Sequence, residues 1–324
     1  MPLAITLDAP GAPDVLQPRE VALAKPGPGE ARIRQTTIGV NFVDVYFRSG
    51  LYPLPARPAI LGLEGAGEVE AVGPDVQGLA PGDRVAYGGF PLGGYAEARN
   101  IPATRLLRVP DAIDLRVAGA SILRGLTAHM LLNKVCRLEE GDWLLVHAAA
   151  GGLGQLVTRW AKRLGYRVVG TVGSPEKAEL ALEAGAECVF SHKDAGWEGE
   201  VRRVADGKGV QLAVDGIGGA MLARTFAAVR PFGVAASLGQ PAGPIPPVAV
   251  ETLSYPRAIA LARPSVLAYC NDPALYRSAA GDLFAALADG LVNPIGAEYP
   301  LRDAARAHAD LESGRTTGSV ILRP

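Results

Sequence analysis

Residues 146–155 read VHAAAGGLGQ, a short apolar run that passes through closely spaced glycines into a helical pattern. As a dinucleotide-binding fingerprint, the stretch places Ala149, Gly151 and Gly154 at the three glycine positions. Gly151 would let the backbone approach a pyrophosphate, and Gly154 would let the helix pack closely on the strand. Free N–H groups at the start of the helix would hold the phosphates. The alternative is a glycine-rich turn that binds no ligand.

The flanking sequence alternates between strand and helix patterns from about residue 120 to 262. LGQLVTRWAKRLG (153–165) has apolar residues at helical spacing and ends at Gly165. SPEKAELALEAGA (174–186) predicts a second helix with Ser174 as its N-cap and Pro175 at its first position. Strands are expected at YRVVGTVG, ECVFS, VQLAVDGIG and GVAASLG. This alternation predicts an α/β fold, a doubly wound parallel sheet with helices on both faces.

The two ends of the chain have a different texture. Residues 1 to about 115 contain many Gly-Pro and Pro-Gly turns between runs of strand character, such as ARIRQTTIGV and GAGEVEAVG. They predict an irregular, mostly β domain. From about residue 265, helical segments are followed by one last strand, GSVILRP. Because a lone strand needs a partner, we expect the C-terminus to return to the first domain.

Composition excludes several classes of protein. With 324 residues, of which 48% are hydrophobic and 20% charged, the chain is long enough for two domains and is not globally disordered. A net charge of −1 gives no basic surface for nucleic acid. No apolar run approaches the ~20 residues of a membrane helix, and the start lacks the basic segment of a secretory signal. Three scattered cysteines favour a reducing compartment, so we expect a cytoplasmic protein.

The end of the second expected strand bears on which dinucleotide binds. NAD sites usually carry an acidic residue there, but this chain has Thr171, Val172, Gly173 and Ser174. Ser174 can donate to a 2′-phosphate and Lys177 follows in the first helical turn, so NADPH is the expected cofactor. Glu176 weighs against this unless its side chain points outward. The alternative is that Ser174 is only a helix cap and that Lys177 is only a solvated lysine.

Several longer motifs together resemble one family. They are GVNFVDVYFRSGLYP (39–53), LGLEGAGEVEAVG (61–73), GDRVAY (82–87), RGLTAHMLL (124–132), HAAAGGLG (147–154), VDGIGG (214–219), LGQPAGPIPP (238–247) and ARPSVLAY (262–269). The chain is similar over its whole length to the zinc-independent medium-chain dehydrogenases/reductases, specifically the NADPH:quinone oxidoreductases of the zeta-crystallin type.

The resemblance implies a Rossmann NADPH-binding domain (121–264) inserted in a GroES-like, β-rich catalytic domain (1–120 plus 265–324). It also implies a homodimer. Zinc-dependent relatives carry a Cys where this chain has Asn41, and a His-Glu pair where it has Leu63-Glu64; they also carry a cluster of four cysteines, which this chain lacks. We therefore expect no metal. Without a Lewis acid, a quinone or an activated enone is the expected acceptor of hydride.

By resemblance, Asn41, Tyr46, Tyr52 and Thr127 are the expected catalytic residues. Asn41 would donate toward a carbonyl oxygen, the tyrosines would line the quinone pocket, and Thr127 would contact the nicotinamide. The alternatives are that Tyr46 and Tyr52 only pack against neighbouring residues, that Asn41 is a turn residue, and that the Thr127 hydroxyl bonds to its own helix backbone. Asp44 is interpreted as structural, and Arg124 is given no role. No obligatory general acid is apparent, so we expect catalysis by positioning, with a proton from Tyr52 or water.

The expected cofactor-binding residues come from the fingerprint, the second strand, the loops after later strands and the interdomain hinge. They are Asn41, Thr127, Ala150, Gly151, Gly152, Leu153, Gly173, Ser174, Lys177, His192, Ile217, Leu238, Gly239, Gln240, Arg263, Ser265 and Arg315. A plain interdomain ion pair is the alternative for Arg263. Relatives often have the basic residue one place before Arg315 and a tyrosine near His192. The alternative functions are a 2-enoyl thioester reductase and a non-catalytic NADPH-binding sensor.

Overall fold

The computed structural model describes all 324 residues, and the chain divides into two compact units. We call Met1–Leu126 together with Val266–Pro324 the terminal unit, and Thr127–Ser265 the central unit. The boundary at Leu126 falls inside one continuous helix, α2 (Leu115–Asn133). Each unit is described by itself below.

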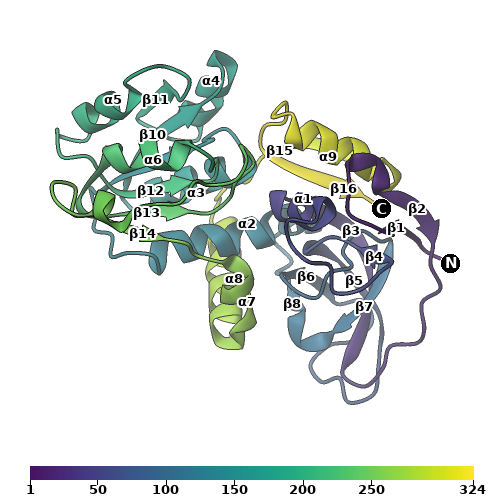
Figure 1. The fold of residues 1–324 in the computed structure, drawn as a ribbon. Coiled ribbons are helices and arrows are strands. Elements are labelled where there is room, and N and C mark those ends of the chain that lie inside the picture. Colours follow the sequence, from purple (N-terminus) through teal and green to yellow (C-terminus); the bar gives the residue numbers. More distant parts are fainter. The chain divides into compact units, whose positions relative to one another are not determined.

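The central unit is built on one sheet of six strands in the order β11-β10-β9-β12-β13-β14, with every neighbouring pair parallel (Figure 1). The strands are β9 (Trp143–His147), β10 (Arg167–Val172), β11 (Cys188–Ser191), β12 (Val210–Asp215), β13 (Val229–Ser237) and β14 (Ala260–Ala262). The chain order reverses next to β9, so the fingerprint strand stands at the switch point of a doubly wound sheet. The expected α/β fold is confirmed.

Helices α3 (Gly152–Arg163), α4 (Pro175–Glu183), α5 (Trp197–Val204) and α6 (Met221–Thr225) flank this sheet (Figure 1). Two of them begin and end as the sequence predicts. Gly165, with φ of 81°, follows α3, and Ser174 is the N-cap of α4 with Pro175 at its first position. The core is largely aliphatic around Leu145, Val169 and Ala213, which are fully buried.

The terminal unit contains a seven-stranded sheet in the order β15-β16-β3-β5-β6-β8, with β7 also paired to β3, and a small sheet β2-β1-β4. The strands are β1 (Leu3–Leu7), β2 (Gln17–Glu20), β3 (Glu30–Val40), β4 (Ala59–Ile60), β5 (Glu64–Val72), β6 (Arg84–Gly88), β7 (Ala98–Pro102), β8 (Leu107–Arg108), β15 (Ile295–Pro300) and β16 (Ser319–Arg323). The last strand, β16, pairs antiparallel with β3. The expected return of the C-terminus to the first domain is confirmed.

Four helices complete this unit besides the first half of α2: α1 (Phe42–Ser49), α7 (Val266–Asn271), α8 (Pro273–Ala288) and α9 (Ala304–Glu312). Short 3-10 turns lie at Pro13–Val15, Ala103–Arg105, Phe226–Ala228, Val250–Leu253 and Leu301–Asp303, the third and fourth of them in the central unit. The main core packs Ile38, Leu61 and Leu322 against α1 and α9. None of the helices combines the length and the apolar surface that crossing a bilayer requires.

Candidate functional site

The loop from β9 to α3 has the geometry that a dinucleotide requires. Gly151 is the N-cap of α3, and a Cβ on it would meet only the carbonyl oxygen of Ala148, at 3.2 Å. A Cβ on Gly154 would lie 2.4 Å from that oxygen and 2.8 Å from Cα of Ala149, so only glycine lets α3 start this close to β9. The first N–H groups of α3, from Gly152 onward, have no partner within the helix. Free N–H groups of this kind at the start of a helix are suited to binding a phosphate.

A buried polar chain supports this edge of the central sheet. The His147 side chain at the end of β9 bonds through Nδ1 to Thr171 Oγ1 at 2.6 Å and through Nε2 to Thr225 Oγ1 at 2.9 Å. Burial lowers the pKa of His147 to about 4, so the ring is neutral near pH 7. Asp215, at the end of β12, accepts hydrogen bonds from the N–H groups of Ile217 and Gly218. These buried polar contacts hold the loops at the carboxyl ends of β10 and β12.

The two later loops expected at the cofactor site lie against each other. A Cβ on Gly218 would stand 2.6 Å from both Cα of Gln240 and the carbonyl oxygen of Gly239, and Leu238 N donates to Asp215 O. The Ile217 turn and the Leu238–Gln240 turn therefore form one rim beyond β12 and β13. Arg263, after β14, donates from Nη1 to Ser237 Oγ at 2.7 Å. This contact lies within the central unit.

The end of β10 gathers cationic side chains. The His192 ring lies beside the Gly173 backbone, and Lys193 lies next to it: a Cβ on Gly173 would be 3.4 Å from His192 Cε1 and 3.9 Å from Lys193 Cε. Lys177 is close enough to contribute to the lowered pKa of His192. Glu176 does not point away from this region, because its carboxylate accepts a hydrogen bond from the Ser174 hydroxyl, which lowers the pKa of Glu176.

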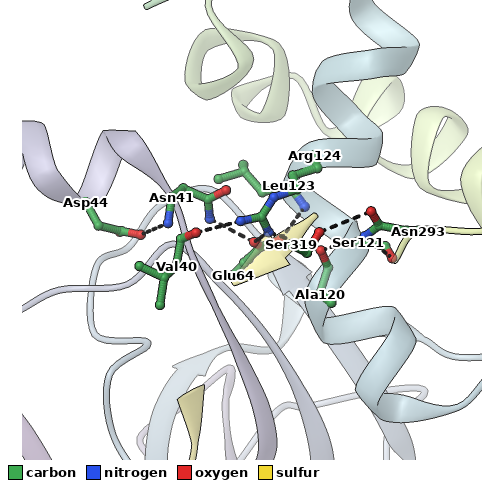
Figure 2. Close-up of polar contacts among 10 residues, drawn as sticks. All are labelled: Val40, Asn41, Asp44, Glu64, Ala120, Ser121, Leu123, Arg124, Asn293 and Ser319. Carbon is green, nitrogen blue, oxygen red and sulfur yellow. Dashed lines mark hydrogen bonds and ion pairs between the residues drawn. The ribbon is translucent and has the colours of Figure 1, made fainter. Parts of the chain in front are cut away.

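The terminal unit contains a buried ion pair beside Asn41 (Figure 2). Glu64 has no exposed surface, and its carboxylate accepts from Arg124 Nη1 at 2.6 Å, from Leu123 N at 2.8 Å and from Asn41 Nδ2 at 2.8 Å. Arg124 also donates from Nη2 to Val40 O. A Cβ on Gly39 would overlap the Glu64 carboxylate at 1.9 Å, so glycine makes room for it. The carboxylate fixes the Asn41 amide with its nitrogen inward and its oxygen directed away.

Asn41 also begins helix α1. Its backbone N–H donates to Asp44 Oδ2 at 2.9 Å, which confirms the structural interpretation of Asp44. Asp44 is fully buried, and burial raises its pKa to about 7. Tyr46 and Tyr52 lie edge to face with ring centroids 5.4 Å apart, and Tyr52 N donates to Tyr46 O. The structure therefore brings the expected acceptor residues Asn41, Tyr46 and Tyr52 onto one short capped helix and the turn after it.

Three expected residues have less distinctive surroundings. Thr127 is buried in α2, and Ser265 ends the central unit. Arg315 forms an ion pair with Asp310 in the terminal unit, at 2.5 Å. Its expected contact with a 2′-phosphate therefore competes with an existing carboxylate partner.

Sequence reasoning missed several polar residues. It gave Arg124 no role, and it did not consider Lys193, Asp215 or His147 as parts of the site. An Asp directly before a glycine-rich turn, as in VDGIGG, is a local signal that would have found Asp215. No local signal connects Glu64 with Arg124, because 59 residues separate them. No group of three or more His, Cys, Asp or Glu side chains is arranged to hold a metal ion.

Comparison with known proteins gives matches in both units. Residues 27–111 match the family model described as an alcohol dehydrogenase GroES-like domain, and residues 152–269 match the one described as a zinc-binding dehydrogenase. The chain is 41% identical over 321 residues to a quinone oxidoreductase of Pseudomonas aeruginosa, with 99% of each chain covered. It is 36% identical to a 2-haloacrylate reductase of a Burkholderia species, covering 100% of this chain and 99% of that one.

A solved structure agrees with these relatives. The quinone oxidoreductase of Escherichia coli, whose crystal structure is complexed with NADPH, superposes with a TM-score of 0.95 at 37% identity, covering 99% of this chain and 100% of that one. This coverage includes both units. The chain belongs to the medium-chain dehydrogenase/reductase family, in its quinone oxidoreductase branch.

Proposed function

We propose that this chain is an NADPH-dependent quinone oxidoreductase that acts on a quinone or an activated enone. The observation that carries the proposal is the loop from β9 to α3, where Gly154 permits a close approach of helix and strand that any Cβ would block. It stands at the switch point of a sheet whose next strand ends without a carboxylate and beside cationic side chains. Full-length relatives named quinone oxidoreductase support the same function.

The residues present fit this cofactor. The pyrophosphate would be held by the backbone at Ala150, Gly151, Gly152 and Leu153. The adenosine end would be held by Gly173, Ser174, Lys177 and His192. The rest of the cofactor would be contacted by the turns at Ile217 and Leu238–Gln240, together with Thr127, Arg263 and Ser265. When bound, NADPH supplies a hydride, which together with one proton reduces a quinone to a hydroquinone.

We assign the binding of the acceptor to Asn41, Tyr46 and Tyr52. Because Glu64 takes one amide hydrogen of Asn41, the outward amide oxygen and the second amide hydrogen remain to orient a bound ring. The two tyrosine rings offer a flat apolar surface, and the Tyr52 hydroxyl can hold a proton close to an acceptor oxygen. A rigid, capped helix keeps these groups in place, which suits catalysis by positioning.

Further parts of the proposal rest on the family resemblance and on chemistry. We propose a catalytic domain of 1–120 plus 265–324 and a cofactor domain of 121–264, a homodimer, and a cytoplasmic location consistent with three unpaired cysteines. The 2-haloacrylate reductase among the relatives favours an activated alkene as a second class of acceptor.

The test is the loss of NADPH absorbance with a panel of small quinones and activated enones, with NADH as the alternative donor. We expect turnover with at least one quinone and a preference for NADPH. Tyr52→Phe should leave the Kd for NADPH unchanged and lower kcat by about tenfold, a typical loss for one positioned hydroxyl. Tight NADPH binding without turnover of any acceptor would favour the sensor function instead.

A further inference from the structure

His192 occupies an unusual position at the adenosine end of the expected cofactor site. It follows β11, and its backbone N–H donates to Val172 O at 3.1 Å, which holds it beside the end of β10. The ring lies against the Gly173 backbone, where a Cβ would be 3.4 Å from Cε1 and 3.5 Å from Nε2. Its Nδ1 atom is buried and has no hydrogen-bond partner in the protein. Buried side-chain nitrogens are nearly always hydrogen-bonded, so one without a partner in the protein calls for an explanation such as a ligand.

The charged groups around His192 are mostly cations. Lys193 is its neighbour in the chain, and Lys177 comes from the first turn of α4. Arg224, from α6, donates to the backbone oxygens of His192 and Asp194. Burial first, and then these three cations, lower the pKa of His192.

The other titratable groups near His192 are two carboxylates and one neutral histidine. Glu198, on α5, is the ion-pair partner of Arg224. Glu176, on α4, is bonded to Ser174. His147, on β9, is neutral because it is buried between two threonines. His192 therefore lies beside three cations, and burial and these cations favour its uncharged form when no further anion is bound.

We propose that NADPH, but not NADH, binds this chain with uptake of a proton by His192, and that the resulting imidazolium helps Lys177 and Lys193 select the 2′-phosphate. The proposal rests on the function proposed above. A phosphate dianion beside the ring favours its charged form and offsets the cations that disfavour it. By linkage, a ligand that binds the protonated form more tightly must take up protons when it binds. The preference for NADPH over NADH should then rise as the pH falls, by at most about tenfold per pH unit.

The experiment is calorimetric titration of the full chain with NADPH and with NADH, in two buffers of different ionisation enthalpy. It is done at about pH 7.5, where a phosphate monoester with a second pKa of about 6 is already a dianion. NADH is the matched control because it lacks only the 2′-phosphate. We expect a proton uptake of roughly 0.3 to 1 per NADPH and close to none per NADH.

The variant His192→Gln removes the titrating group while retaining a polar side chain. Its proton uptake with NADPH should fall to that with NADH, and its Kd for NADPH should rise about fivefold to tenfold, as expected for loss of one charge-assisted contact. Its Kd for NADH should change by less than about twofold. Lys193→Gln should weaken NADPH binding and keep the proton uptake.

Two results would overturn the inference: equal proton uptake with the two cofactors, or an uptake that His192→Gln retains. Quinone turnover measured on the same preparations separates this inference from the proposed function. A wild-type chain that does not bind NADPH contradicts both. A chain that binds NADPH and reduces quinones without a His192-dependent uptake contradicts only the proton linkage.

Discussion

The terminal and central units treat charge in opposite ways at the sites that the family resemblance assigns to them. In the terminal unit, the Glu64 carboxylate is fully buried and is bonded by Arg124, Asn41 and the backbone of Leu123. In the central unit, His192 keeps a buried nitrogen without a partner, among cations at the end of β10. The first arrangement is complete without a ligand, and the second leaves a buried ring nitrogen without a partner.

The difference indicates what each site has to do. An acceptor with no charge needs a surface that is already shaped, so rigidity around Asn41 and α1 is useful before it binds. A phosphate brings its own charges, so a region with several cations favours its binding. In the free protein, burial and then the neighbouring cations lower the pKa of His192, so the ring is held in its uncharged form until an anion binds.

The largest expected effect breaks the completed network of the terminal unit. Arg124→Ala leaves the Glu64 carboxylate buried without its cation, so the free energy of unfolding should fall by about 3 to 5 kcal/mol. The control is Arg116→Ala on the same helix, which removes a pair with Glu298 whose side chains are 55% and 30% exposed. That change should cost less than about 1 kcal/mol.

Denaturant unfolding followed by circular dichroism measures both variants. All three tryptophans, Trp143, Trp160 and Trp197, lie in the central unit, so their fluorescence reports that unit separately. If Arg124→Ala lowers the free energy of unfolding no more than Arg116→Ala does, the buried ion pair contributes no more to stability than a surface pair.

The next effect concerns the pH dependence of the cap on α1. Burial raises the pKa of Asp44 from 3.8 to about 7, so between these values the native chain keeps a proton that the unfolded chain releases. The contribution of Asp44 to the free energy of unfolding should therefore decrease as the pH rises from 4 to 7, by about 1.4 kcal/mol per pH unit and roughly 4 kcal/mol in all. Asp44→Asn should remove this decrease.

The stability of both chains is measured by denaturant unfolding at several pH values, and the difference between the two profiles isolates Asp44. Asp14→Asn, at an exposed carboxyl group, is the control and should leave the profile unchanged. Parallel profiles for the wild type and Asp44→Asn would contradict the raised pKa.

The smallest effect sharpens the comparison in the central unit. Lys177→Ala removes one cation from the phosphate end, so the Kd for NADPH should rise about tenfold, equivalent to 1.4 kcal/mol, and that for NADH by less than about twofold. Lys208→Ala, at an exposed lysine of the same unit, should affect neither cofactor. Fluorescence titration measures the four constants. Equal losses for both cofactors would place Lys177 away from the 2′-phosphate.

The sequence predicted local features well where the signal lies within a few residues. The glycine spacing at 149–154, the cap at Ser174 and the stop at Gly165 each follow from backbone chemistry that neighbouring residues impose. The return of β16 to β3 followed from the need of any strand for a partner. The direction of the Glu176 side chain was left open, and the structure places it against Ser174.

The chain by itself determined the alternation of strands and helices in the central unit, the dinucleotide loop and the absence of a carboxylate in the last residues of β10. These depend on periodicity and on single residues whose backbone requirements are local. Only the tertiary structure decided that Glu64 meets Arg124, that Asp215 and His147 hold the loops at the sheet edge, and that Arg315 pairs with Asp310. A buried charge needs a partner, but which distant residue provides it depends on how the elements pack.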